Sequence, residues 1–268
     1  MEKEQIYHDE PGTPLNAFLA RAGLCSRRAA VELIKNGKIY VNGEIVTEPG
    51  YRVQQHDKVK YQDKIYRPEK HVYLLLNKPK GYVTTTADEM ERKTVLDLIK
   101  GKGLGKERLY PVGRLDRDTT GVLLITNDGY LSQRLAHPKN NITKKYYVVL
   151  DKPLHIDDTN KLKKGVYLED GKSWFDKVTL TGDKAGKMVI VDIHGGKNRI
   201  IKRMFKHLGY KVVALDRIEF AGITKKKLET GSWRHLTDAE VEELKMFKKE
   251  SKKAPVPARK VEKKEIKD

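Results

Sequence analysis

Hydrophobic positions near the start of the chain recur at the spacing of a helix. This spacing predicts a first helix over residues 15–22, which Gly23 would end. Ser26 suits the N-cap of a second helix over residues 27–36, and Gly37 suits the position just after its end. The two helices would carry most of their basic side chains on their polar faces.

The pattern then changes to short β-prone runs. Asn42 and Gly43 lie between two such runs and both tolerate a positive φ, which predicts a two-residue hairpin. A further strand pair is expected within residues 57–66. Two helices and a small sheet in so short a segment predict a compact domain.

The longer remainder of the chain favours strands over helices. Apolar runs predict strands at residues 73–76, 122–126, 145–150, 177–181 and 187–194, and helices are expected at 131–136, 158–164 and 198–208. Because these elements do not alternate regularly, we predict an α+β fold with a mostly antiparallel, mixed sheet and flanking helices. The expected division is a disordered terminus at 1–11, a small domain at 12–67, a linker at 68–72, a larger domain at 73–247 and a basic disordered tail at 248–268.

Charge narrows the range of partners. The formal net charge is +18, of which residues 248–268 supply part, with nine basic and four acidic side chains. A chain this basic is expected to bind a polyanion, nucleic acid first and an anionic membrane second. No apolar stretch approaches the roughly 18 residues of a membrane span, so we expect no membrane partner. The start of the chain lacks the apolar core of a signal peptide, and with Cys25 as the only cysteine we expect a reduced, cytoplasmic protein.

Three acidic residues surround the apolar run of the stretch VGRLDRDTTGVLLITNDG. Asp128 follows the run in a turn and has an ordinary structural duty there. Asp116 and Asp118 precede it, interleaved with Arg114 and Arg117, which already neutralise the carboxylates that a divalent cation would need. We therefore expect no metal site.

Two roles remain possible for these aspartates. They form salt bridges within a loop, or one of them is a catalytic carboxylate. A neighbouring arginine lowers the pKa of an aspartate by about 1 to 3 units, which keeps it ionised as a nucleophile at neutral pH. These arguments do not choose between Asp116 and Asp118.

The basic side chains of the small domain are candidates for RNA backbone contacts, although a solvated helix face is the plainer interpretation. The stretch LNAFLARAGLCSRRAAVELIKNGKIYVNG resembles an S4 RNA-binding domain, with its SRR turn, helix-ending glycine and VNG hairpin in order. This resemblance, over roughly residues 13–60, implies RNA contacts by Arg21, Arg27, Arg28, Lys35 and Lys38.

The acidic stretch is similar to the signature of the RsuA/RluB group of ribosomal RNA pseudouridine synthases. In that group the aspartate of GRLD is the catalytic carboxylate, which implies this role for Asp116. Other elements of the group occur in order: NKPKG at 77–81, the Lys-x-Tyr of Lys144 and Tyr146, and KNRIIKRMFKHLGYKVVALDR at 197–217. The resemblance implies that Tyr146 stacks on the uracil or takes a proton, and that Lys202 holds the carboxylate.

Further basic and polar residues are expected around the same cleft. The resemblance implies RNA contacts by Lys78, Lys80, Arg114, Arg117, Lys144, Asn198 and Arg199, for which surface charge is the alternative. The chain departs from the group at Gly195, Lys197 and Ile200, where relatives commonly have Glu, Arg and Gln. The departure at Ile200 puts the anchoring of the aspartate loop or of the target backbone in question.

The implied reaction moves the glycosidic bond of uridine from N1 to C5 without redox change, so we expect no cofactor. Extruding the uridine costs a few kcal/mol, which favours targets in loops. The expected partner is ribosomal RNA, either free or in an assembling subunit, with a monomeric enzyme. A large-subunit target is preferred over a small-subunit one. The alternatives from other classes are a non-catalytic ribosome-assembly factor and a metal-dependent nuclease.

Overall fold

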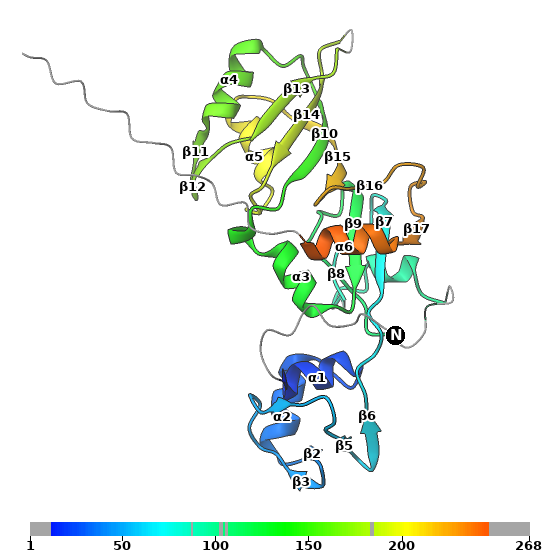
Figure 1. Ribbon diagram of the computed structural model, residues 1–268. Coiled ribbons are helices and arrows are strands. Elements are labelled where there is room, and N and C mark those ends of the chain that lie inside the picture. The colour runs from blue at the N-terminus through cyan, green and yellow to red at the C-terminus, as the bar shows by residue number, and fades with distance from the viewer. Residues whose placement is uncertain (1–11, 87, 102–103, 105–106, 183–184, 247–268) are drawn as a thin grey trace, which may run out of the picture.

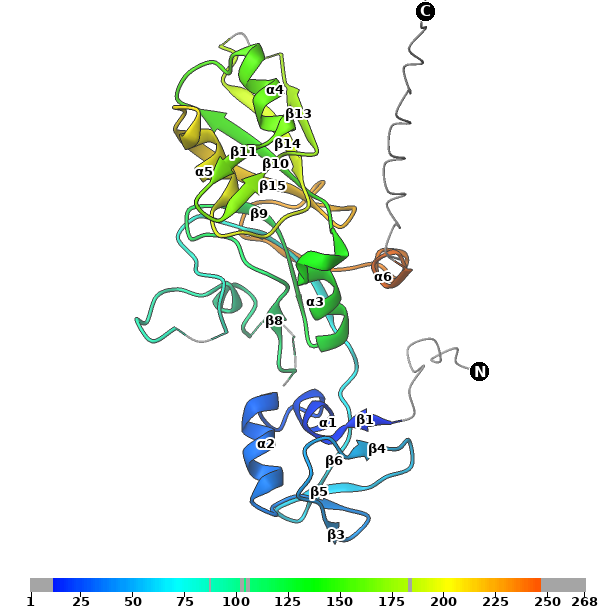
Figure 2. The same ribbon diagram turned by 90° about the vertical axis from the view of Figure 1, so that its left-hand side faces the viewer.

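A computed structural model describes residues 12–86, 88–101, 104, 107–182 and 185–246. The small amino-terminal unit lies at one end of the molecule, and the larger sheet with its helices forms the rest (Figures 1 and 2). The terminus expected to be disordered at 1–11 and the tail at 248–268 lie outside the described residues. No helix in the described part of the chain is long and apolar enough to cross a membrane.

The amino-terminal unit consists of two helices and short antiparallel strands. Ser26 caps the second helix by accepting a hydrogen bond from the Ala29 N–H at 3.0 Å, and Asn42 and Gly43 form the predicted hairpin turn with φ of 53° and 93°. Leu15, Leu19 and Ile34 are fully buried between the helices and the sheet. The elements are β1 Thr13–Pro14, α1 Leu15–Arg21, α2 Arg27–Lys35, β2 Tyr40–Val41, β3 Glu44–Ile45, β4 Arg52–Val53, β5 Val59–Tyr61 and β6 Lys64–Tyr66.

The larger unit is built on a nine-stranded sheet whose central path runs β13-β14-β10-β15-β9-β7-β17. Every pair in it is antiparallel except β9 with β15, so the sheet is mixed as predicted. The strands are β7 Tyr73–Lys78, β8 Tyr110–Pro111, β9 Thr120–Thr126, β10 Lys144–Leu150, β13 Lys177–Leu180, β14 Met188–Ile193, β15 Val212–Phe220, β16 Ile223–Thr224 and β17 Trp233–His235. The sequence pattern did not predict β15, although it lies at the centre of the sheet.

Helices cover both faces of this sheet. Side chains of α4 and α5 join one apolar core with β10 and β14, and side chains of α3 and α6 join a second core with the opposite face of β7 and β9. Asp128 has the structural duty expected of it, because it caps α3 by accepting a hydrogen bond from the Leu131 N–H at 3.0 Å. The helices of the larger unit are α3 Gly129–Ala136, α4 Ile156–Lys164, α5 Ile200–His207 and α6 Asp238–Met246, with the short 3₁₀ helices η1 Val95–Leu98 and η2 Pro138–Asn140. A separate hairpin consists of β11 Val166–Leu168 and β12 Gly171–Ser173.

The parallel contact between β9 and β15 forms a seam in the sheet. It consists of two residue pairs, Thr120 with Asp216 and Gly121 with Arg217. Gly121 has a φ of 108°, and a Cβ added there would lie 2.1 Å from the carbonyl oxygen of Arg217, so this position requires glycine. The seam brings the loop before β9 next to α5, the helix that precedes β15.

Candidate active site

Asp116 lies in the loop that leads into β9, and two cations from the start of α5 face it. Its Oδ2 atom is 3.7 Å from Nε of Arg199 and 3.9 Å from Nζ of Lys202. The Asp116 side chain keeps 35% of its surface exposed, so it is both paired and accessible. The structure therefore brings together the carboxylate and the lysine that the sequence predicted as neighbours.

Asp118 is the closer partner of Lys202. Its Oδ2 accepts a hydrogen bond from Lys202 Nζ at 2.5 Å. Burial is the largest influence on this carboxyl and opposes its ionisation, but the hydrogen bond and the charge of Lys202 outweigh burial and lower the pKa of Asp118. Lys202 thus bridges two carboxylates and is held mainly by the second.

Lys78 does not occupy the position expected of a phosphate ligand. Its side chain is fully buried, and its ammonium donates to the carbonyl oxygens of Thr119 at 2.8 Å, Asp116 at 3.0 Å and Pro79 at 3.1 Å. Burial lowers the pKa of Lys78 to about 8, against the opposing charges of Asp118 and Asp116. This placement does not fit the predicted RNA contact, and Lys78 instead fixes the backbone of the aspartate loop.

The same loop is braced from its other side by residues 81–84. The hydroxyl of Thr84 donates to the Leu115 carbonyl at 2.8 Å, and the Gly81 N–H donates to the Arg117 carbonyl at 2.8 Å. Sequence reasoning missed Thr84, because nothing in a single threonine of the run YVTTT signals that it will meet a residue 31 positions away.

A cleft of about 710 Å³ opens in front of Asp116. Its volume falls within the range of about 300 to 1,000 Å³ that is usual for small-molecule sites. Asp116 and Asp118 line it together with four of the predicted RNA-binding residues, Lys80, Arg114, Arg117 and Arg199. These carboxylates thus lie in a cleft that carries a surplus of positive charge.

Tyr146 and Lys202 are not among the residues that line this cleft. Tyr146 lies in β10 with 8% of its surface exposed, in the same apolar core as Leu115 and Ile200. Tyr146 is therefore largely covered in this structure. Base stacking by Tyr146 stays a prediction.

Lys144 directs its ammonium to backbone atoms as well. It donates to the carbonyl oxygens of Ile142 at 3.0 Å and His194 at 3.2 Å, and burial, followed by the charge of Arg217, lowers its pKa to about 8. This placement does not fit the predicted RNA contact. Lys144 instead supports the turn that precedes α5.

The start of α5 differs from the prediction in one detail. The helix begins at Ile200 rather than at residue 198, and its N-cap is Arg199, whose φ of 46° is in the left-handed region. Asn198 and Arg199 are both exposed. Ile200 is buried in the apolar core, which suits the hydrophobic residue at this position.

The predicted RNA-binding residues of the amino-terminal unit divide by exposure. Arg27, Arg28, Lys35 and Lys38 are exposed on and after α2. Arg21 is half-buried, and its carbonyl accepts a hydrogen bond from the Glu69 N–H at 3.2 Å, in the segment that leads to the larger unit. The exposed four form a basic surface on one helix and the residues that follow it.

Comparison with known proteins agrees with this geometry. The family model for RNA pseudouridylate synthases matches residues 72–207, and the S4 domain model matches residues 13–59. The ribosomal large subunit pseudouridine synthase B of Bacillus subtilis (strain 168) is 39% identical over 243 residues, which span 90% of this chain and 98% of that protein. The dual-specificity RNA pseudouridine synthase RluF of Escherichia coli (strain K12) is 33% identical, over 86% of this chain and 77% of that protein.

A solved structure gives the same result. The crystal structure of a pseudouridylate synthase superimposes with a TM-score of 0.61 at 31% identity, and covers 86% of this chain and 98% of that chain. Together with the aspartate signature and the amino-terminal module, these similarities show that the chain belongs to the RNA pseudouridylate synthase family, as an RsuA/RluB-type member that carries an S4 domain.

Proposed function

We propose that this chain isomerises a uridine of large-subunit ribosomal RNA to pseudouridine, with Asp116 as the catalytic carboxylate. The observation that carries the proposal is an accessible Asp116 at a cationic cleft, 3.7 Å from Arg199 and 3.9 Å from Lys202. The large-subunit target is supported by the 39% identity with the Bacillus subtilis enzyme over nearly the whole of both chains.

In this proposal the carboxylate of Asp116 acts on the flipped uridine, either by attacking the sugar or base or by assisting elimination of uracil to a glycal. Both routes use the carboxylate of Asp116, which lies 3.7 Å from Nε of Arg199 and 3.9 Å from Nζ of Lys202. The bond from N1 to C1′ breaks, uracil turns, and C5 bonds to C1′. Tyr146 stacks on the base or takes the proton that leaves C5, and Lys202 holds the carboxylate in place.

The RNA is bound at two surfaces in this proposal. Lys80, Arg114, Arg117 and Arg199 contact the phosphates that flank the flipped nucleotide. The basic surface of Arg27, Arg28, Lys35 and Lys38 holds a more distant part of the RNA by charge and shape. The domain boundaries that go with these roles are residues 12–67 for the RNA-binding domain and 73–247 for the catalytic domain. We propose a monomeric, cytoplasmic enzyme, because one chain supplies both surfaces and ribosomal RNA is its substrate.

The test is a comparison of Asp116→Asn with Asp118→Asn. The first removes the proposed catalytic carboxylate, so we expect no detectable pseudouridine with RNA binding retained. The second removes a partner of Lys202, and we expect a fall in rate of about 10-fold, the effect of roughly 1.4 kcal/mol. Asp157→Asn serves as the control, because Asp157 is an exposed aspartate in the first turn of α4. If Asp116→Asn keeps normal activity, the assignment is wrong.

The target is tested by mapping pseudouridines in ribosomal RNA from cells with and without this protein. Loss of one site in the large-subunit RNA would support the proposal. Loss of a pseudouridine in the small-subunit RNA would support the alternative target, small-subunit ribosomal RNA. An unchanged map with altered subunit assembly would favour a non-catalytic assembly factor.

A further inference from the structure

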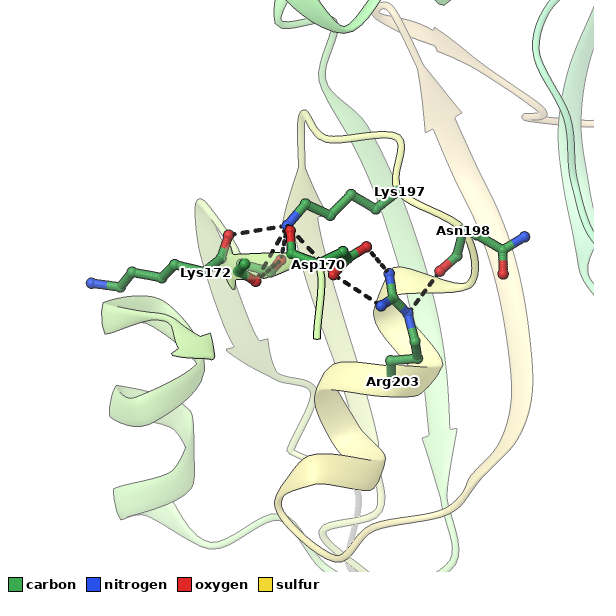
Figure 3. Close-up of polar contacts among 7 residues, drawn as sticks. Asp170, Lys172, Lys197, Asn198 and Arg203 are labelled. Carbon is green, nitrogen blue, oxygen red and sulfur yellow. Dashed lines mark hydrogen bonds and ion pairs between the residues drawn. The ribbon is translucent and has the colours of Figure 1, made fainter. Parts of the chain in front are cut away.

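The turn that carries Arg199 is attached to a hairpin that lies outside the cleft. Figure 3 shows Lys197 and Arg203, at the start of α5, directed at Asp170, the residue before β12, and the Asn198 carbonyl oxygen directed at Arg203. The two Nη atoms of Arg203 bind the two carboxylate oxygens of Asp170, at 3.0 Å and 2.8 Å. The hydrogen bonds from Arg203 are the main cause that lowers the pKa of Asp170 below its ordinary value.

Lys197 makes the second attachment. Its ammonium donates to the carbonyl oxygen of Asp170 at 2.7 Å, to the hydroxyl of Ser173 at 3.1 Å and to the carbonyl oxygen of Gly171 at 3.3 Å. The turn of the hairpin is thus bound from above by Lys197 and from the side by Arg203 (Figure 3). We call Asp170, Lys197 and Arg203 the hairpin clamp.

The clamp also fixes the backbone next to Arg199. Arg203 Nε donates to the carbonyl oxygen of Asn198 at 2.9 Å, so the same guanidinium binds the hairpin and the residue before Arg199. Arg199 itself has a φ of 46°. A left-handed conformation costs a non-glycine residue about 1 to 2 kcal/mol and persists only where surrounding contacts enforce it. The clamp supplies such contacts on the amino-terminal side of Arg199.

We propose that the hairpin clamp positions Arg199 against Asp116, so that Asp170 and Lys197 influence the reaction without contacting the reacting atoms. This inference rests on the proposed function, because it takes the 3.7 Å contact between Arg199 and Asp116 to be important for the reaction. Asp170, Lys197 and Arg203 are positioning residues, and none of them is among the residues that line the cleft.

The clamp contributes more to geometry than to stability. The side chains of Asp170 and Arg203 are 43% and 31% exposed, and ion pairs with such exposure typically contribute about 0 to 1 kcal/mol to folding. The hairpin has a separate anchor, because Val166 of β11 is buried in the apolar core. Breaking the clamp should therefore lower activity while leaving the melting temperature almost unchanged.

The experiment compares four variants of the full chain in single-turnover pseudouridine formation. We expect Asp170→Asn and Lys197→Met each to lower the maximal rate about 10-fold, with the half-saturating RNA concentration within about 2-fold of the parent. Lys197→Arg should restore most of the rate, because Arg keeps the positive charge and adds donors. Lys172→Met is the matched control, since the Lys172 side chain lies on the same hairpin and points away from Arg203 and Asn198 (Figure 3).

A double-mutant cycle with Arg199→Ala tests the route of the effect. If the clamp acts through Arg199, Asp170→Asn should lower the rate no further in the Arg199→Ala background. The proposal is overturned if Asp170→Asn keeps the full rate, if its effect is undiminished without Arg199, or if the loss follows a drop in melting temperature. Failure of the proposed function would appear separately, as normal activity in Asp116→Asn.

Discussion

Asp116 and Asp118 are two residues apart in the same loop, and they differ in what surrounds them. Asp118, whose side chain is 62% exposed, takes the short hydrogen bond of Lys202, whereas Asp116, 35% exposed, sits at ion-pair distance from two cations. Asp118 thereby anchors Lys202, and Asp116 keeps oxygen lone pairs available for a substrate. The different roles of the two aspartates follow from their distances to Lys202, which the order of residues in the sequence does not reveal.

At the residue scale, we predict that Lys78→Met removes the support of the aspartate loop. Three carbonyl oxygens would lose their buried donor, which costs about 2 kcal/mol of unfolding free energy, and the rate should fall at least 10-fold as the loop shifts. Urea unfolding and single-turnover rates measure the two effects. Lys80→Met is the control, because Lys80 is exposed and its loss should leave stability unchanged.

The pH dependence of this stability difference has a definite sign. Burial lowers the pKa of Lys78 from 10.5 to about 8 in the folded chain, so between these values the unfolded chain binds more protons. Raising the pH through this range therefore stabilises the folded parent relative to Lys78→Met, by about 1 kcal/mol per pH unit. A stability difference that shrinks between pH 8 and pH 10 would contradict this account.

Lys78 also marks the limit of what the sequence could predict at this scale. The run NKPKG contains two lysines beside a proline and a glycine, a pattern typical of an exposed loop. Lys78 is the last residue of β7, and the aspartate loop closes over it from 38 residues further along the chain. That closure is a tertiary contact, so local composition predicted exposure for a lysine that is buried. Asp116 was predicted to be the catalytic carboxylate through the family resemblance, because local charge alone left both Asp116 and Asp118 as candidates.

At the scale of elements, the seam between β9 and β15 decides where the aspartate loop lies. Only Thr120 and Gly121 of β9 pair with β15, and the backbone of Arg217 closes on Gly121. Two charged residues of β15 find partners across the seam. Asp216 accepts from Thr120 Oγ1 at 2.7 Å, and buried Arg217 donates to the Val122 carbonyl at 2.7 Å.

We predict that Gly121→Ala opens this seam. The new methyl group would meet the Arg217 carbonyl at 2.1 Å, and the φ of 108° is itself unfavourable for alanine. The expected result is a loss of more than about 3 kcal/mol of unfolding free energy, or failure to fold, measured by thermal unfolding. Gly43→Ala is the comparison, since its φ is 93° but no atom lies within 4 Å of the added Cβ. Equal losses in both variants would show that backbone strain, not the close contact, dominates.

The same seam explains which elements the sequence could predict. The second helix was predictable because its cap, its apolar face and its terminal glycine are all local signals. β15 was not, because Asp216, Arg217 and Glu219 interrupt its apolar pattern. These charges are tolerated in a strand only through partners from β9, β10 and Lys225, which a local pattern does not contain.

At the scale of the whole molecule, positive charge is divided between the cleft and the amino-terminal unit. The net charge of +18 predicted a polyanionic partner, and four exposed basic residues lie on and after α2, in the amino-terminal unit at one end of the molecule (Figure 2). Affinity for RNA should therefore come from both units, while the chemistry belongs to one.

We predict that deleting residues 1–66 weakens RNA binding and flattens its dependence on salt, with some catalysis retained. Each lost phosphate contact should reduce the slope of log affinity against log salt by about 0.7 to 0.9. Binding titrations at several salt concentrations measure this slope, and Arg28→Ala with Lys35→Ala in the intact chain should reproduce part of the change. A truncated enzyme that modifies its natural RNA with full efficiency at elevated salt would show that the amino-terminal unit does not serve as an RNA handle.

The late position of β15 in the chain also bears on synthesis. Asp116 comes before both strands of the seam in the chain. Arg199, Lys202 and β15, the strand that completes the seam, all come later than Asp116 and β9. Under the proposed function, we expect a nascent chain to bind RNA through its S4 domain before it can modify RNA, because the seam forms only after β15 has left the exit tunnel. On this expectation, RNA binding precedes modification during synthesis, and a chain that ends before β15 would bind RNA without modifying it.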